Sequence, residues 1–180
     1  MEIIKKTETE LETYQVIISG NFRFIFYYNF LCICIGAGKF SKAIFWSNKI
    51  NNDTSYGGRE DIQCFSRILS LIIHFELKNI SLLKAITKST YRYLHKKKRL
   101  YKIESILIAF VRKIYRINNS KKLTEAFILL RKKRIALSKN PYEKKAFDYF
   151  DFISWLESKI ENNPFAEVVK EKVSTSEKFR

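Results

Sequence analysis

The chain has 180 residues, 46% of them hydrophobic and 15% aromatic, which suffices for a sizeable core and excludes a wholly disordered protein. Five glycines and two prolines are too few for the many turns of a β-sandwich or barrel, so the composition favours helices. The net charge of +16 is unevenly placed, because residues 81–140 hold 18 Lys and Arg against two acidic residues while the rest of the chain is balanced.

The predicted elements are all helices, because apolar residues recur at three- and four-residue spacing along most of the chain. Gly20 is expected to end the first helix, and the polar run 51–58 is the clearest loop. Residues 174–180 are expected to form a disordered tail. The predicted helices, about eight in number, span 7–19, 22–36, 41–50, 59–77, 81–98, 100–117, 124–138 and 141–161, and a short helix near 165–172 completes the set.

The last long helix has a strong start signal, with Asn140 as cap, Pro141 at the first helical position and Glu143 at the third.

The short connections predict that neighbouring helices pair as antiparallel hairpins. We therefore expect an all-α fold with one domain over 1–173, made of hairpins at about 22–50, 59–98 and 100–138 followed by the helix 141–161.

A short repeat recurs at the turn of each predicted hairpin, at intervals of 40 and 43 residues. An apolar residue is followed each time by a hydroxyl residue, which is typical of a helix N-cap preceded by a hydrophobic staple. Stacking such hairpins buries faces that none of them can bury alone. The repeated pairs are Phe40–Ser41, Ile80–Ser81 and Leu123–Thr124.

The first hairpin resembles a tetratricopeptide repeat, in which a glycine closes one helix, an aromatic residue opens the turn and a small residue lets the second helix pack closely. Lys78 and Leu83 replace the glycine and alanine in the second hairpin, and the third keeps only Ala126. The resemblance covers roughly 21–138 and implies a short α-solenoid that binds peptides or proteins and is rarely catalytic. The residues that carry it are Phe30, Leu31, Gly38, Phe40, Ala43 and Ile50.

Catalytic and metal-binding patterns are scarce in the sequence. His74 and His95 are the only histidines, and the apolar neighbours of His74 predict a place in or beside the core. Cys32, Cys34 and Cys64 form no zinc-site spacing and are expected to be core residues in a reducing compartment. We predict no catalytic residue, no cofactor and no metal site.

The longest uncharged run, 24–38, has 15 residues, whereas a transmembrane helix needs about 20. The first residues also lack the apolar stretch of a signal peptide. We predict a cytoplasmic protein without a transmembrane segment.

Charged residues at the ends of helix 59–77 are expected to fix the packing of its neighbours. Arg59, Glu60 and Asp61 lie at its start and Glu76 at its end. We expect Glu76 to pair with Arg92 on the adjacent helix, and a ligand site is the alternative interpretation of these charged residues.

The basic region, residues 81–140, is the part of the sequence that says most about function. Its clusters lie near helix ends, and antiparallel stacking would place the 96–99 and 131–134 clusters on one edge as a positive rim. Four interpretations stay open: a solvated surface, a site for an acidic protein or peptide, a nucleic-acid site in which tyrosines stack on bases, and contact with an anionic membrane surface. The candidate partner-binding residues are Lys96, Lys97, Lys98, Arg99, Arg112, Lys113, Arg116, Arg131, Lys132, Lys133, Arg134, Tyr91, Tyr93 and Tyr101.

The leading hypothesis is a non-catalytic scaffold that binds a protein or peptide partner. The alternative is a nucleic-acid-binding helical-repeat protein that uses the basic region. An apolar end face of an incomplete array would also favour self-association.

Overall fold

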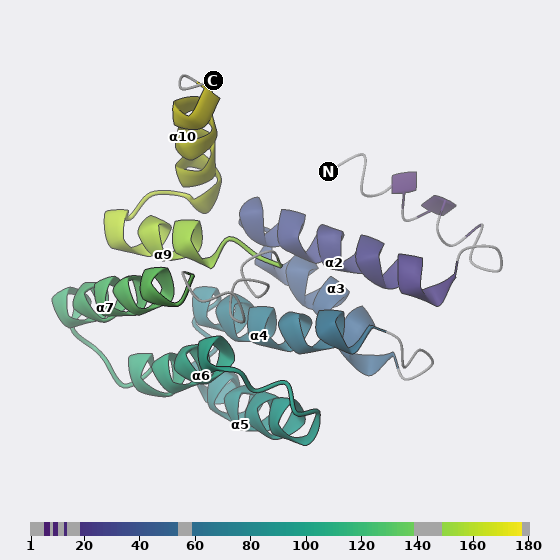
Figure 1. The fold of residues 1–180 in the computed structure, drawn as a ribbon, viewed down its shortest axis with the longest axis horizontal. Coiled ribbons are helices and arrows are strands. Elements are labelled where there is room, and N and C mark those ends of the chain that lie inside the picture. The colour runs from purple at the N-terminus through teal and green to yellow at the C-terminus, as the bar shows by residue number, and fades with distance from the viewer. Residues whose placement is uncertain are drawn as a thin grey trace.

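A computed structural model describes residues 6–7, 9–10, 13, 19–53, 59–138 and 149–177, and over these residues the protein is all-helical, without a strand. This confirms the fold class expected from the scarcity of glycine and proline. Figure 1 shows the arrangement of the helices. Their bounds are α2 Gly20–Gly36, α3 Phe40–Asn52, α4 Glu60–Glu76, α5 Ile80–Lys96, α6 Lys102–Ile114, α7 Ser120–Ser138, α9 Phe152–Glu161 and α10 Phe165–Glu177.

The expected end of the first helix at Gly20 is wrong, because Gly20 is buried and begins α2. Ser19 precedes it with an extended backbone (φ −58°, ψ 147°), so the break falls one residue earlier. Of the predicted helix 7–19, the described residues 7, 9–10 and 13 are helical, and most of the others lie outside the described part. Asn51 and Asn52, expected in a loop, extend α3.

Two expectations near the C-terminal end are also wrong. Residues 149–151 are not helical, so the predicted helix 141–161 begins only at Phe152 within the described residues, and its start signal at Asn140 and Pro141 lies outside them. The Asp151 carboxylate accepts the Ser154 amide at 2.9 Å, which caps α9 and explains its start at Phe152. Residues 174–177, expected to be disordered, continue α10.

Each helix from α2 to α6 packs on the next one, and α4 also contacts both α2 and α6. In Figure 1, α2, α4 and α6 accordingly lie side by side, with α3 and α5 behind them. The chain then leaves this arrangement: α7 packs more extensively on α9 than on α6, and α10 packs on α9. One continuous cluster of buried apolar side chains runs from α2 through α9.

The turns of the first two hairpins have the same geometry. Gly38 and Lys78 both adopt the left-handed conformation, at φ 66° and 56°. In each turn the next amide donates to a carbonyl five residues back, from Lys39 to Cys34 and from Asn79 to His74. These bonds close the helix end as in a Schellman motif, so the recurrence detected in the sequence reflects a shared turn.

The expected hydroxyl caps are wrong. Ser41 and Ser81 lie inside their helices, which begin one residue earlier, and no side chain caps either helix. In the third hairpin α7 already begins at Ser120, and the Asn119 side chain accepts the Lys122 amide at 3.0 Å. The left-handed residue, rather than the following hydroxyl, sets the start of α3 and α5.

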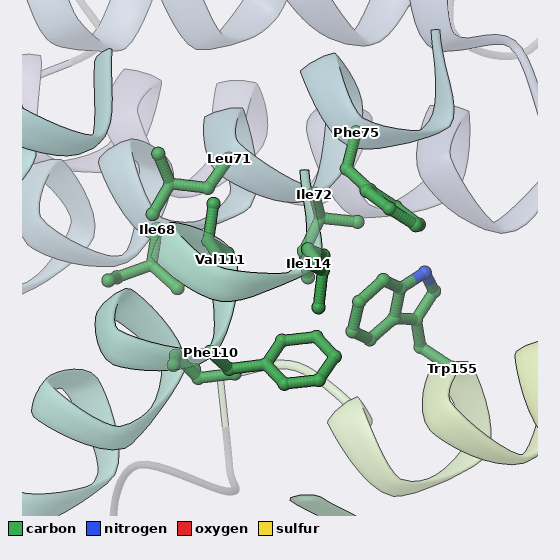
Figure 2. Close-up of a pocket in the computed structure, with 9 residues that line it drawn as sticks. Ile68, Leu71, Ile72, Phe75, Phe110, Val111, Ile114 and Trp155 are labelled. Carbon is green, nitrogen blue, oxygen red and sulfur yellow. The ribbon is translucent and has the colours of Figure 1, made fainter. Parts of the chain in front are cut away.

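The core between α4, α6 and α9 contains a cavity of about 10 Å³ lined by apolar side chains, of which eight are labelled in Figure 2. This volume holds no more than one water molecule. Close packing at this point joins α9 to the α2–α6 layers and leaves no room for a ligand.

Among the described residues, no helix has both the length and the apolar character that crossing a membrane requires.

Candidate partner-binding site

The basic residues of α5, α6 and α7 form a positive surface with very little acidic compensation. Among the described residues of this stretch the two carboxylates are Glu104, which is buried, and Glu125. Cations on the solvent side of all three helices therefore dominate the local field. The exposed cations are Lys84, Lys88, Arg92, Lys96, Lys98, Arg99, Lys102, Arg112, Lys113, Arg116, Lys121, Lys122, Lys132 and Lys133.

The 96–99 cluster forms the end of α5 and the following turn. Lys98 adopts the left-handed conformation at φ 54°, and the Arg99 amide donates to the Leu94 carbonyl, which closes the helix. Lys97 points back to α4, where its ammonium lies 2.5 Å from a Glu60 carboxylate oxygen, and this pairing raises the Lys97 pKa. Lys96, Lys98 and Arg99 remain exposed, whereas Lys97 is half-buried and paired with Glu60.

The 131–134 cluster is divided between surface and core. Lys132 and Lys133 are exposed, but Arg131 pairs with Glu157 on α9 at 2.6 Å. Arg134 has no exposed surface, and its guanidinium stacks on the Phe152 ring at 4.3 Å. The expectation that Arg134 binds a partner is therefore wrong: an apolar side of α7 is buried against α9, and Arg134 lies on that side.

The three candidate tyrosines have different environments. Tyr91 is partly exposed and lies under the Arg112 guanidinium at 4.9 Å, and Tyr101 is 51% exposed. Tyr93 is engaged internally, because its hydroxyl donates to Gln63 at 2.8 Å and Arg67 covers its ring at 4.0 Å. Only Tyr91 and Tyr101 are available to an external ligand.

The positive rim expected from the 96–99 and 131–134 clusters is also divided, because the two clusters contact different helices. The 96–99 cluster contacts the start of α4 through Lys97, whereas the 131–134 cluster contacts α9 through Arg131 and Arg134. The surface that continues from one helix to the next is instead the solvent side of α6 and α7, where Lys113 and Lys133 lie.

A groove of about 180 Å³ separates α6 from α7 between these two lysines. Its walls are apolar. Leu129 of α7 contributes to them and is 56% exposed, on a helix that is otherwise rich in lysine and arginine. Neither Lys113 nor Lys133 forms an ion pair with another residue that the structure describes. Besides the lysines, the groove is lined by Ile106, Ala109, Phe110, Ile114, Ile117, Ala126, Leu129 and Leu130.

The apolar part of this groove was not predicted. Its signal in the sequence is Leu129, which does not belong to the stripe Phe127, Leu130 and Leu137 that faces the core. Together with the apolar residues of α6 that line the groove, Leu129 forms a contiguous apolar surface beside Lys113 and Lys133, and such a surface is typical of a binding site.

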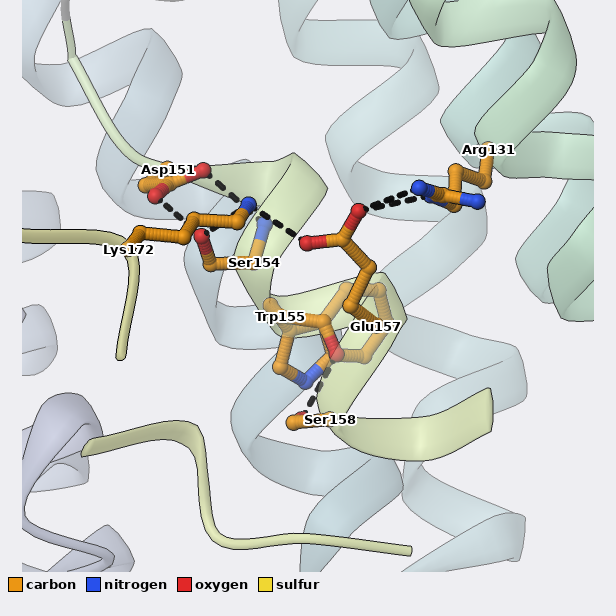
Figure 3. A network of polar contacts seen from close by, with 7 residues as sticks. All are labelled: Arg131, Asp151, Ser154, Trp155, Glu157, Ser158 and Lys172. Carbon is orange, nitrogen blue, oxygen red and sulfur yellow. Dashed lines mark hydrogen bonds and ion pairs between the residues drawn. The ribbon is translucent and has the colours of Figure 1, made fainter. Parts of the chain in front are cut away.

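A polar cluster on α9 connects neighbouring helices through ion pairs and does not form an open site (Figure 3). The Glu157 carboxylate, whose side chain is 10% exposed, pairs with Arg131 of α7 and with Lys172 of α10 at 2.5 Å. One carboxylate thus joins three helices. Two charge-assisted contacts offset the cost of burying it.

Lys172 also lies 2.7 Å from the Ser154 hydroxyl, which in turn donates to Asp151. A serine beside a lysine can act as a nucleophile when the lysine is neutral and substrate can reach the hydroxyl. Here Ser154 has no exposed surface, and the Lys172 amine is held in an ion pair with Glu157. The geometry therefore supports a structural role for this cluster in joining helices, and not a nucleophilic role for Ser154.

The expected pair between Glu76 and Arg92 is wrong. Glu76 accepts hydrogen bonds from the Trp155 indole at 2.7 Å and from Lys159 at 2.8 Å, both on α9. These residues line a cavity of about 260 Å³, together with residues of the α2–α3 turn and Phe165 of α10. The cavity's charged groups bind each other, which leaves no charged group free for a ligand.

At the start of α4, Asp61 accepts hydrogen bonds from Arg59 at 2.8 Å and from the Tyr149 hydroxyl at 2.6 Å. Burial raises the Asp61 pKa, but these bonds outweigh burial and bring it down to about 2. Burial and the bond to Asp61 raise the Tyr149 pKa to about 12. The Tyr149 ring stacks on Phe65 at 4.0 Å, so this cluster attaches the chain before α9 to α4.

The lowered Asp61 pKa makes stability depend on pH. The ionised carboxylate stabilises the fold above the unfolded-state pKa of about 3.9, and this contribution is lost as the pH falls toward 2. We expect Asp61→Asn to be less stable than the wild type at neutral pH by about 1 kcal/mol, because the group is partly exposed. Urea denaturation should show this difference shrinking between pH 4 and pH 2. A difference that stays constant over that interval would contradict the pairing.

The histidine and cysteines that were expected in or near the core lie there. His74 is 8% exposed, and burial lowers its pKa. Cys34 and Cys64 are buried and Cys32 is half-buried, and all three are free. Burial raises the pKa of Cys32 to about 12 and of Cys64 to about 11, which makes both thiols poor nucleophiles at neutral pH.

Among the described residues, no group of His, Cys, Asp and Glu has the geometry of a metal site. No known protein family, curated protein or solved structure matches the chain.

Proposed function

We propose that the protein is a non-catalytic helical-repeat scaffold that binds an acidic segment of a partner protein in the groove between α6 and α7. The observation that carries this proposal is the combination of apolar walls with one lysine on each side, Lys113 and Lys133. Protein interfaces typically have an apolar centre with polar or charged residues around it. A partner that inserts one apolar side chain and places carboxylates beside it fits both features.

Two further observations support a scaffold. The hairpins α2–α3 and α4–α5 share their turn geometry and pack in chain order, as in tetratricopeptide-like repeats. The third hairpin departs from this pattern because α7 packs mainly on α9, and the groove lies where α6 and α7 separate. Three free cysteines fit a reducing compartment, which supports the cytoplasm as the place of action.

The test is binding of short peptides, measured by fluorescence anisotropy. We expect a glutamate-rich peptide with one central leucine to bind at least about tenfold more tightly than the same peptide with serine in that place, because the groove buries the leucine. Lys113→Glu combined with Lys133→Glu should weaken binding by about tenfold or more.

Lys39→Glu combined with Lys42→Glu is the matched control, since it changes the net charge equally on exposed lysines of the α2–α3 hairpin. We expect it to leave binding nearly unchanged. Equal affinity for the leucine and serine peptides, or equal loss in both double variants, would contradict a role for the groove.

The second candidate is binding of single-stranded nucleic acid at the α5–α6 turn. It is favoured by Tyr101, which is exposed between the cations Arg99 and Lys102 and is able to stack on a base. An oligothymidine should then bind more tightly than either peptide and weaken steeply with salt. Tyr101→Ala would reduce that binding, and the groove variant would reduce it no more than the Lys39 and Lys42 control.

A further inference from the structure

The outer side of α2 is apolar and lacks charge over its whole length. Phe22 is 61% exposed, Phe26 36% and Ile33 51%, and Asn29 lies between them. These four residues fall on one side of the helix, opposite the buried Phe24, Leu31 and Ile35. Arg23, the only charged residue of α2, is half-buried off this stripe. Solvent-facing sides of helices are normally polar, so this outer stripe is a surface without a partner among the residues that the structure describes.

The spacing of the stripe is symmetric. Phe22, Phe26, Asn29 and Ile33 are separated by four, three and four residues, so the pattern reads the same in both directions. Two antiparallel copies of α2 related by a two-fold axis would place Phe22 against Ile33 and Phe26 against Asn29 of the other copy. A two-fold interface requires this kind of self-complementarity.

The distribution of charge favours the same arrangement. All of the excess positive charge lies in residues 81–140, so two copies repel each other wherever α5, α6 and α7 approach. The helix α4 separates α2 from α6, and Figure 1 shows α2 at the opposite end of the layers from α5 and α6. Association through α2 keeps the two basic surfaces apart and buries a long side of a helix that carries no charge.

We propose that the protein forms a two-fold symmetric homodimer through the outer stripe of α2. The stripe is about 16 Å long at the helical rise. A single pair of helices buries less than the area of about 1,600 Å² that is typical of stable complexes. The dimer is therefore weak and reversible, with a dissociation constant on the order of micromolar.

Sedimentation velocity of the full chain tests the proposal. We expect the weight-average mass to rise from 21.4 kDa toward twice that value between low and high micromolar concentration. Phe26→Asp should weaken dimerisation more than about tenfold, because it places a buried, unpaired charge at the centre of the interface. Asn29→Arg is the second variant: Asn29 is exposed and contributes nothing to the core, so this change should abolish the dimer while the helical circular dichroism stays unchanged.

Leu82→Asp is the matched control, since Leu82 is 47% exposed on α5, outside the stripe. It should leave the dimer intact. The predicted register is tested by mixing Phe22→Cys and Ile33→Cys chains, which should form a disulfide across the two copies more efficiently than either chain alone. A monomer at every concentration, including one whose stripe is covered by its own N-terminal residues, would overturn the proposal. A dimer insensitive to both Phe26→Asp and Asn29→Arg would overturn it as well.

Discussion

Replacing Trp155 by alanine is expected to lower the free energy of unfolding by about 3–5 kcal/mol. Trp155 is 3% exposed and lies edge-on to Phe75 of α4 and to Phe127 of α7. Its indole also donates to Glu76 at 2.7 Å. The substitution would enlarge the small cavity of Figure 2 and remove a hydrogen bond from a largely buried carboxylate. Chemical denaturation followed by circular dichroism measures the loss.

Tyr101→Ala is the control for this substitution, because Tyr101 is also aromatic but 51% exposed. Its effect should stay within about 0.5 kcal/mol. If Trp155→Ala were equally mild, α9 would not be packed against α4 and α7 as described.

The second large effect is expected for Glu157→Gln, which keeps the shape of the side chain and removes its charge. Arg131 and Lys172 would then face each other across a neutral amide. Removing one partner of a buried pair typically costs about 3–5 kcal/mol, and the partial exposure of both cations reduces our expectation to about 1–3 kcal/mol. The measurement is the urea midpoint at neutral pH.

The pair between Lys170 and Glu167 on α10 provides the matched control. Both side chains are well exposed, at 71% and 49%. Glu167→Gln should therefore change stability by less than about 0.5 kcal/mol. Equal effects of the two substitutions would mean that Glu157 does not join α7 to α10.

The sequence predicted the fold class and most of the helices well, because core-facing residues recur at helical spacing. The break at Lys78, between the predicted helices 59–77 and 81–98, was also predicted correctly. The end of α5 was harder to place: α5 ends at Lys96, because Lys98 adopts a left-handed conformation that glycine usually provides, and no local pattern distinguishes Lys98 from other exposed lysines. The non-helical stretch 149–151 depends on Asp151 capping α9 and on Tyr149 binding Asp61, a contact across 88 residues.

The candidate site could be predicted only in part. Its charge is evident from composition, but which cations face the solvent depends on partners distant in the sequence, such as Glu60 for Lys97 and Glu157 for Arg131. The prediction that Arg134 binds a partner was an avoidable error. It lies in register with Phe127, Leu130 and Leu137 on the core-facing stripe of α7, so the spacing alone indicates burial.

The two proposals assign different surfaces to different partners. We propose the basic groove between α6 and α7 for an acidic segment and the uncharged stripe of α2 for a second copy of the chain. The two surfaces lie on helices that α4 separates, so a dimer would present two grooves at once. Such a bivalent arrangement raises the apparent affinity for a partner that carries two acidic segments.

The most direct test of the account is an amide NMR titration of the protein with the leucine-containing acidic peptide. We predict that the largest shift changes fall on residues of the α6–α7 groove, including Ala109, Lys113, Leu129 and Lys133, with the α2–α3 hairpin unaffected. Shift changes spread evenly over the exposed lysines of the chain, or confined to the α5–α6 turn, would contradict the groove as the binding site.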